Sequence, residues 1–146
     1  MTPDERKQRL DALYPVGEKR TDTVRSRSGR PLADISLQNI LRSGELDIDD
    51  IGISADGLRT QAEIARLAGR ETLARNFERA AELVTVPDGL LIEVYELLRP
   101  GRAKDAQVMR DMARRLRRDY DAERIAGLIE EAAEVYERRG LFKKRF

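Results

Sequence analysis

The side chains that could do chemistry in this 146-residue chain are carboxylates, arginines and hydroxyls, because the sequence contains no His and no Cys. These absences exclude an imidazole base, a thiolate nucleophile and metal sites built on His or Cys ligands. The carboxylates of Glu130, Glu131 and Glu134 could in principle serve acid/base catalysis. They lie in a strongly charged stretch, where we expect exposure and an ordinary pKa. We therefore expect neither a catalytic nor a cofactor-binding residue in this chain.

An acidic segment offers the other possible chemistry, a metal site built from oxygen ligands. Four aspartates lie close together in the sequence: Asp47, Asp49, Asp50 and Asp56. A calcium loop of the EF-hand type needs a longer ordered set of ligands that ends in a bidentate Glu, and the sequence lacks that pattern. We expect no metal site here.

Arginines gather near the C-terminal end of the chain: Arg110, Arg114, Arg115, Arg117, Arg118 and Arg124. The planar guanidinium suits phosphates and carboxylates. However, acidic residues such as Asp111 and Asp119 interrupt the cluster, and few aromatic side chains are present to stack on bases. The pattern favours a solvated or partner-pairing face. A helical nucleic-acid-binding or regulatory module that uses the Arg110–Arg124 face remains the alternative.

Apolar residues recur at helical spacing through most of the chain, and no pair of strands is indicated. Ser36 and Ser54 are good N-caps for two of the helices. We expect Leu46–Ile53 to be an extended or single-turn connector. The predicted helices are Ser36–Gly44, a long helix from Ser54 with a break near Gly69, its second half over 73–84, Pro87–Pro100, and two closing helices that meet near Asp119–Ala122, with Gly140 ending the last. The fold class is therefore all-α, a single small helical domain of about five or six helices.

Residues 1–35 are the least regular part of the chain. Between Lys19 and Leu32 the sequence has too few large apolar residues to pack a core of its own. This extended N-terminal segment is therefore either mobile or laid across another surface. We divide the chain into this segment, 1–35, and a helical domain, 36–146.

No apolar run approaches the roughly 20 residues that cross a bilayer. The start of the chain, Met1–Arg9, is polar, unlike a signal peptide. We expect a cytoplasmic protein with no membrane partner. Composition and charge do not indicate what such a protein does.

Several segments in the middle and at both flanks closely resemble the small subunit of adenosylcobalamin-dependent diol and glycerol dehydratases. The resemblance covers roughly residues 14 to 142, and the order and spacing of the matching segments make chance a poor explanation. The central segments are Gln61–Ala65, Ala68–Arg70, Leu73–Leu83, Val86–Asp88 and Tyr95–Pro100, and the flanking ones are Tyr14–Pro15, Ser28–Leu32, Asp34–Ser36, Asn39–Leu41 and Glu131–Arg139.

The resemblance implies an enzyme that converts 1,2-diols such as propane-1,2-diol or glycerol to aldehydes and water. Family members contain large, medium and small subunits, arranged as a dimer of heterotrimers. Adenosylcobalamin lies between the large and medium subunits and starts radical chemistry by homolysis of its cobalt–carbon bond. The small subunit packs on the large one and supplies no catalytic residue, so we carry none over to this sequence.

On this hypothesis, residues 14–42 wrap the large subunit, because they are too polar to pack alone yet carry scattered apolar side chains. The candidate interface residues are Tyr14, Pro15, Leu32, Ile35 and Leu37. The preference between glycerol and propanediol belongs to another chain. Enclosure of the complex in a bacterial microcompartment is left open by this sequence.

Overall fold

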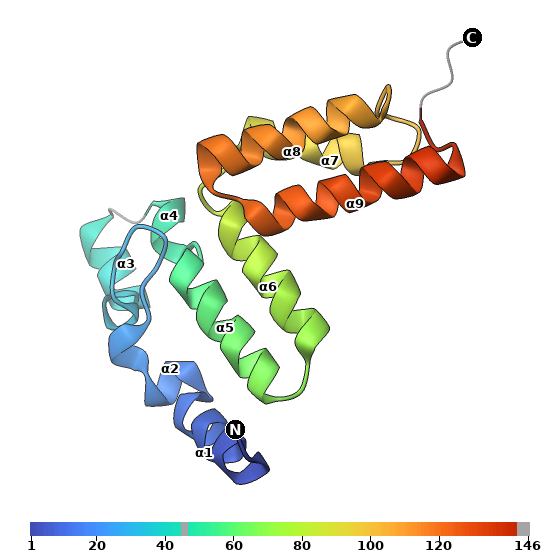
Figure 1. Cartoon of the computed structure of the whole chain (residues 1–146). Coiled ribbons are helices and arrows are strands. Elements are labelled where there is room, and N and C mark those ends of the chain that lie inside the picture. The colour runs from blue at the N-terminus through green and yellow to red at the C-terminus, as the bar shows by residue number, and fades with distance from the viewer. Residues whose placement is uncertain (45–46, 143–146) are drawn as a thin grey trace. The chain divides into compact units, whose positions relative to one another are not determined.

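The computed structural model describes residues 1–44 and 47–142, apart from the side chains of Ile40 and Ser43. Within these ranges every regular element is a helix (Figure 1). The all-α fold class predicted from the sequence is confirmed.

The helices expected from the sequence are all present. They are α3 (Leu37–Ser43), α5 (Ala55–Leu67), α6 (Glu71–Leu83), α7 (Asp88–Leu98), α8 (Ala106–Tyr120) and α9 (Glu123–Arg139). Their ends follow the local signals. The hydroxyl of Ser36 accepts a hydrogen bond from the N–H of Asn39 at 3.2 Å, and the hydroxyl of Ser54 accepts one from the N–H of Gly57 at 3.0 Å. Gly69 has φ +77°, which disfavours any side chain, so the helical path breaks there between α5 and α6.

Residues 1–35 are more helical than we expected. They contain α1 (Pro3–Leu13), α2 (Val16–Lys19) and the 3-10 turns η1 (Thr21–Thr23) and η2 (Leu32–Asp34). No residue of α1 is buried, so apolar periodicity could not predict this helix. It depends on a capping box, in which the Thr2 hydroxyl accepts from the N–H of Glu5 at 3.2 Å and the Glu5 carboxylate accepts from the N–H of Thr2 at 2.6 Å. The description of this segment as extended therefore holds only between these helical turns.

The connector after α3 contains a single helical turn, α4 (Ile48–Ile51). A single turn was one of the two forms that we expected, the other being an extended connector. Leu46, where the expected connector begins, lies outside the described residues. Asp47 starts the turn, because its carboxylate accepts a hydrogen bond from the N–H of Ile48 at 2.6 Å. The carboxylate of Asp50 accepts in return from the N–H of Asp47 at 3.1 Å.

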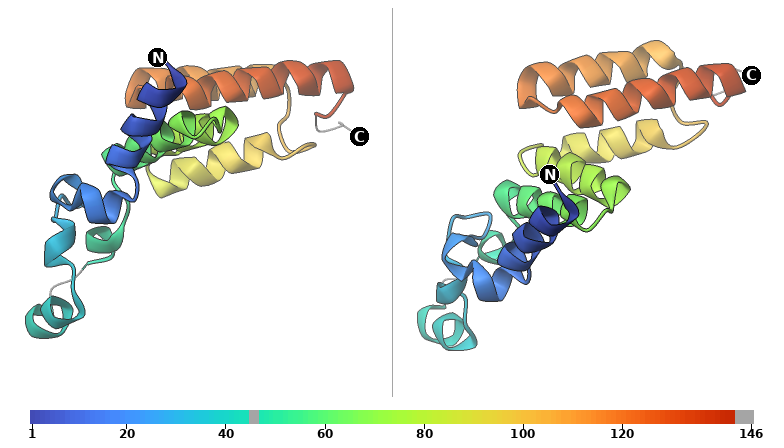
Figure 2. Two further views of the ribbon diagram at one scale, coloured as in Figure 1. Left: turned by 90° about the horizontal axis from the view of Figure 1, so that it is seen from below. Right: turned by 60° about the horizontal axis from the view of Figure 1, so that its bottom comes forward.

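The chain divides into two compact units, Met1–Ala81 and Glu82–Phe146. The boundary expected after residue 35 lies inside the first unit. The reason is that α1 packs along α5, where Arg9 and Glu63 form an ion pair at 2.5 Å (Figure 2).

The second unit contains the larger hydrophobic core. Helices α8 and α9 lie side by side in both views, and buried side chains of α7 join the same cluster (Figures 1 and 2). Alanines on both helices are buried and allow close approach of their backbones, while Met109, Leu116 and Ile129 fill the remaining space without any exposure. The buried alanines of these two helices are Ala106, Ala113, Ala126 and Ala133.

Two tyrosines also belong to this core. Tyr120 and Tyr136 are half-buried against it, and the hydroxyl of Tyr136 donates to the carbonyl of Leu98. Tyr95 instead is 63% exposed, with the guanidinium of Arg99 over its ring at 5.9 Å. Tyr95 therefore contributes to a surface and not to the core.

The first unit has a much smaller core. Its buried cluster consists of Ala62, Ala65 and Ala74, with Phe77 packed against it. Three methyl groups and one ring offer little apolar area. Leu58, Ile64 and Leu67 of α5 are also buried, whereas other large apolar side chains of this unit lie on its surface or in a cleft.

Truncation of Leu116 to Ala should lower the free energy of unfolding by about 2–5 kcal/mol, because it leaves a cavity in a core position that has no exposure. Ile92→Ala is the control, since Ile92 is 64% exposed and should change stability by only about 0.5 kcal/mol. Urea unfolding followed by circular dichroism measures both. Equal effects of the two substitutions would show that the α8–α9 core is not the stabilising element of the second unit.

Candidate protein-binding surface

The carboxylates considered for acid/base chemistry are not arranged for it. Glu130 accepts two hydrogen bonds from the guanidinium of Arg117, at 2.5 and 2.6 Å, which lower the pKa of this carboxyl. A carboxylate held ionised in this way is a poor proton donor. Glu131 and Glu134 are exposed.

The four aspartates of the acidic segment were the candidates for a metal site built from oxygen ligands. Among the residues that the structure describes, no group of three or more acidic side chains is placed to hold a metal ion. Nor does any helix in the described ranges have the length and hydropathy of a membrane-spanning segment.

We call the six arginines of the sequence cluster the basic face. Each of them pairs with a carboxylate. The contacts are Arg110–Glu137 (3.1 Å), Arg114–Asp111, Arg115–Glu93 (3.9 Å), Arg117–Glu123 (2.8 Å) and Arg117–Glu130 (2.5 Å), Arg118–Asp119 (2.6 Å) and Arg124–Glu82 (3.9 Å). A phosphate would have to compete with these carboxylates for each guanidinium. The face is thus better suited to joining helices of the second unit than to binding nucleic acid.

Five exposed large apolar side chains of the first unit lie on α3, on α4 and in the short link between α4 and α5. We call this group the α3–α4 apolar patch, and its members, exposed between 54% and 82%, are Leu37, Leu41, Ile48, Ile51 and Ile53. Leu37 and Leu41 are four residues apart on α3, and Ile48 and Ile51 are three apart on α4, so each pair occupies one face of its helix. Gathered exposure of this kind is typical of a surface that binds another protein.

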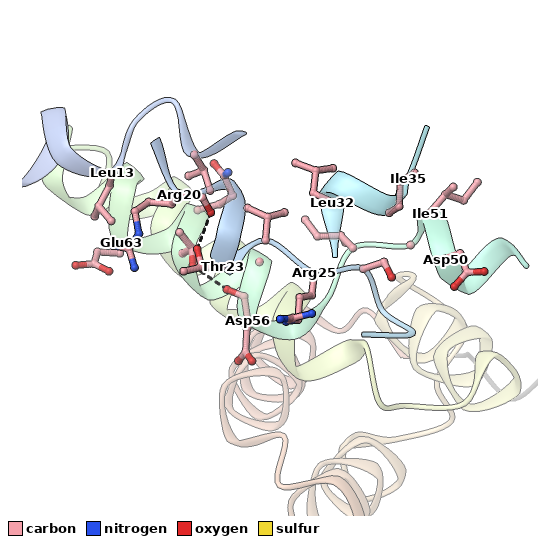
Figure 3. A pocket seen from close by; sticks show the side chains of 18 residues that line it. Leu13, Arg20, Thr23, Arg25, Leu32, Ile35, Asp50, Ile51, Asp56 and Glu63 are labelled. Atoms are coloured by element: carbon pink, nitrogen blue, oxygen red, sulfur yellow. Dashed lines mark hydrogen bonds between the residues drawn. The ribbon is translucent and has the colours of Figure 1, made fainter. Parts of the chain in front are cut away.

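A cleft of about 480 Å³ adjoins this patch, between the N-terminal segment on one side and α4 and α5 on the other (Figure 3). Ile51 and Ile53 belong to both the patch and the cleft. The cleft's apolar lining consists of Leu13, Val16, Val24, Leu32, Ile35, Ile51 and Ile53. The two features therefore form one continuous apolar surface.

One wall of the cleft is held by a buried carboxylate. Asp50, only 6% exposed, accepts a hydrogen bond from the Ser28 hydroxyl at 2.5 Å and pairs with Arg30 at 3.2 Å. Together with the hydrogen bond from the N–H of Asp47, these contacts lower the pKa of the Asp50 carboxyl. The loop that carries Ser28 and Arg30 is thereby fastened to α4.

Backbone contacts reinforce this attachment. The N–H of Arg27 donates to the carbonyl of Gly52 at 2.7 Å, and the N–H of Ser28 donates to the carbonyl of Asp49 at 3.1 Å. An isolated β-bridge joins Ser26 to Ile53. The loop and α4 thus form a single wall, which fixes the position of Ile53 at the edge of the cleft.

The five candidate interface residues fall into three places. Leu32 and Ile35 are half-buried and line the cleft together. Tyr14, 58% exposed, lines a separate hollow of about 390 Å³, and Pro15 follows it at the start of α2. Leu37 is exposed on α3.

Sequence reasoning missed four members of the α3–α4 apolar patch: Leu41, Ile48, Ile51 and Ile53. The available signal was the alternation of isoleucine with aspartate in the segment 48–53, which we interpreted only as a connector. Apolar residues in a segment too short for a core helix indicate a surface when no partner strand is present.

Comparison with known proteins gives concordant matches. The profile of the "Dehydratase small subunit" family matches residues 10–143. The propanediol dehydratase small subunit of Citrobacter freundii is 41% identical over 130 residues, which cover 89% of this chain and 74% of the relative. The propanediol dehydratase small subunit of Salmonella typhimurium strain LT2 is 39% identical over the same length and coverage.

Replacement of the buried carboxylate by an amide, Asp50→Asn, should loosen the wall of the cleft. The amide cannot accept the charge-assisted contact from Arg30, so backbone N–H groups of residues 26–30 should exchange with solvent faster, on the order of tenfold. Native-state hydrogen exchange measures this. Asp22→Asn, at an exposed position of η1, is the control and should leave the exchange unchanged.

The same wall should weaken in acid. Because the folded state holds the pKa of Asp50 below its ordinary value of 3.8, the stabilisation is complete above that pH and is lost as the pH falls through the lower pKa of the folded protein. The protection factors of residues 26–30, which correct for the intrinsic pH dependence of amide exchange, should therefore fall below pH 3.8 in the natural chain and depend less on pH in Asp50→Asn. Identical pH profiles in the two proteins would remove Asp50 from this role.

The isolated chain should not bind nucleic acid in a saturable way near physiological ionic strength, because the guanidinium groups of the basic face are already neutralised. Fluorescence anisotropy of a labelled DNA duplex and of a labelled RNA checks this. Tight binding that weakens steeply with added salt would contradict the assignment and favour the nucleic-acid alternative.

Proposed function

Because the chain belongs to the dehydratase small-subunit family, we propose that it is the non-catalytic small subunit of a coenzyme B12-dependent diol or glycerol dehydratase. The observation that carries this proposal is the family match over residues 10–143, joined by two curated small subunits at about 40% identity. Both relatives are named for propanediol dehydratase, so we propose 1,2-diols as the substrate class, with aldehyde and water as products.

The chemistry belongs to the partner subunits. Adenosylcobalamin, bound by the large and medium subunits, supplies the radical that starts the reaction. This chain has no His that could serve as a lower cobalt ligand. Glu130, which we considered for acid/base catalysis, is neutralised by Arg117. Its own residues therefore act on assembly, and not on the substrate.

Assembly with the large subunit uses residues 14–42, through Tyr14, Pro15, Leu32, Ile35 and Leu37. The physical support is exposure, because these apolar side chains lie on the surface or in a cleft of the isolated chain. Burying one Leu or Ile side chain contributes about 1.5–3 kcal/mol, so a few such residues suffice to hold a subunit. The complete enzyme in this proposal is a dimer of heterotrimers in the cytoplasm, free or inside a bacterial microcompartment.

Omission of this chain tests the proposal. Co-expression of the large and medium subunits with this chain should yield a complex with dehydratase activity in the presence of adenosylcobalamin, and this chain alone should have none. Without it, the other two subunits should assemble poorly and lose most of the activity. Size-exclusion chromatography with an aldehyde assay measures both properties.

Normal assembly and full activity of the other two subunits in the absence of this chain would overturn the proposal. Hydrogen exchange gives a second reading on the complex. Residues 14–42 should become protected there, and unchanged exchange would place the interface elsewhere.

A further inference from the structure

The cleft of the first unit carries positive charge that its own residues do not neutralise. Three carboxylates line it, and each already has an arginine partner. The pairs are Asp50–Arg30 at 3.2 Å, Asp56–Arg59 at 2.8 Å and Glu63–Arg9 at 2.5 Å.

Two further arginines, Arg20 and Arg25, line the same cleft (Figure 3). Within the described ranges of the chain neither forms an ion pair, and Arg25 makes only a long hydrogen bond of 3.4 Å to the carbonyl of Gly29. The cleft and its paired partners thus carry five guanidinium groups against three carboxylates, an excess of two positive charges. The arginines of the second unit's basic face differ, since all of them are paired.

The cleft combines an apolar lining with two arginines that form no ion pair within the described residues, and this combination suits an acidic, amphipathic ligand. We infer that the cleft binds an amphipathic, acidic segment of a partner dehydratase subunit, with large apolar side chains entering beside Ile51 and Ile53 and carboxylates pairing with Arg20 and Arg25. This inference rests on the proposed function, because it takes the partner from there. It adds the chemical character of the docking segment and the residues of this chain that recognise it.

A second copy of this chain does not fit the cleft as well. Its own acidic and apolar segment, Ile48–Ile51, has its carboxylates already engaged. Asp49 pairs with Arg27 at 3.1 Å, and Asp50 is buried against Ser28 and Arg30. This segment of a second copy is therefore a poor occupant, and the crosslinking experiment below tests the other segments.

Site-specific crosslinking identifies the occupant directly. A photoreactive amino acid replaces Ile51 in the full chain, which is co-expressed with its large and medium subunits. After irradiation of the purified complex, mass spectrometry should find a crosslink to a peptide of one of these subunits that has Asp or Glu beside large apolar residues. A crosslink to another copy of this chain, to a basic peptide, or none in the assembled complex would overturn the inference.

Charge reversal tests the two arginines. The double variant Arg20→Glu/Arg25→Glu should raise the Kd for the partner subunits about tenfold or more, because it turns attraction into repulsion. The matched control is Lys104→Glu/Arg138→Glu, which makes the same change of charge at exposed positions of the second unit and should alter the Kd less than about twofold. Equal effects of the two doubles would remove the cleft from recognition.

A matched pair of substitutions tests the contribution of apolar contacts to binding. Ile51→Asp should weaken the complex more than Ile92→Asp, although the two isoleucines are equally exposed at 66% and 64%. Circular dichroism spectra and melting temperatures close to those of the natural chain establish that the variants are folded. A larger effect of Ile92→Asp would move the docking surface to α7.

Failure of this inference and failure of the proposed function give different results. If the natural chain does not co-purify with the larger subunits, the proposed function itself is wrong. If the natural chain co-purifies and the Arg20→Glu/Arg25→Glu variant does so equally well, only the assignment of the cleft is wrong.

Discussion

The first unit buries only some of its large apolar side chains, such as Leu58, Ile64 and Leu67, and the rest determine the properties of its surface. Its central cluster consists of three alanines and Phe77, while five leucines and isoleucines between Leu37 and Ile53 are more than half exposed. Small domains bury a limited fraction of their surface, and side chains left over must face water or a partner. A surface of this kind favours association with another protein.

Polar contacts hold together the part of this unit that lies outside its small core. Asp50 joins the loop at Ser28 and Arg30 to α4, and backbone hydrogen bonds from Arg27 and Ser28 extend the same attachment. Such contacts are directional, so they can hold one wall of a cleft in place without filling it.

The second unit buries apolar side chains and pairs its charged ones within itself. Buried alanines bring α8 and α9 together, and the arginines on their surface pair with carboxylates of the same unit. Charge that looks like a binding face in the sequence is therefore neutralised by side chains up to 42 residues away, as for Arg124 and Glu82. The chain as a whole carries 28 basic and 27 acidic residues, so the arginines without an ion pair at the cleft of the first unit are a local feature.

The sequence by itself determined α3, the helices from α5 to α9, and the family. Caps at Ser36 and Ser54 and the break at Gly69 are local signals, because each acts within about one helical turn. Only the tertiary structure decided which apolar residues face water, since periodicity shows that Ile48 and Ile51 share a face but not what that face meets. It also decided that Arg117 meets Glu130 while Arg20 and Arg25 meet no carboxylate of the described chain, because pairing depends on segments that folding brings together. The helix α1 was missed although its capping box is also a local signal, because none of its residues is buried and apolar periodicity is therefore weak there.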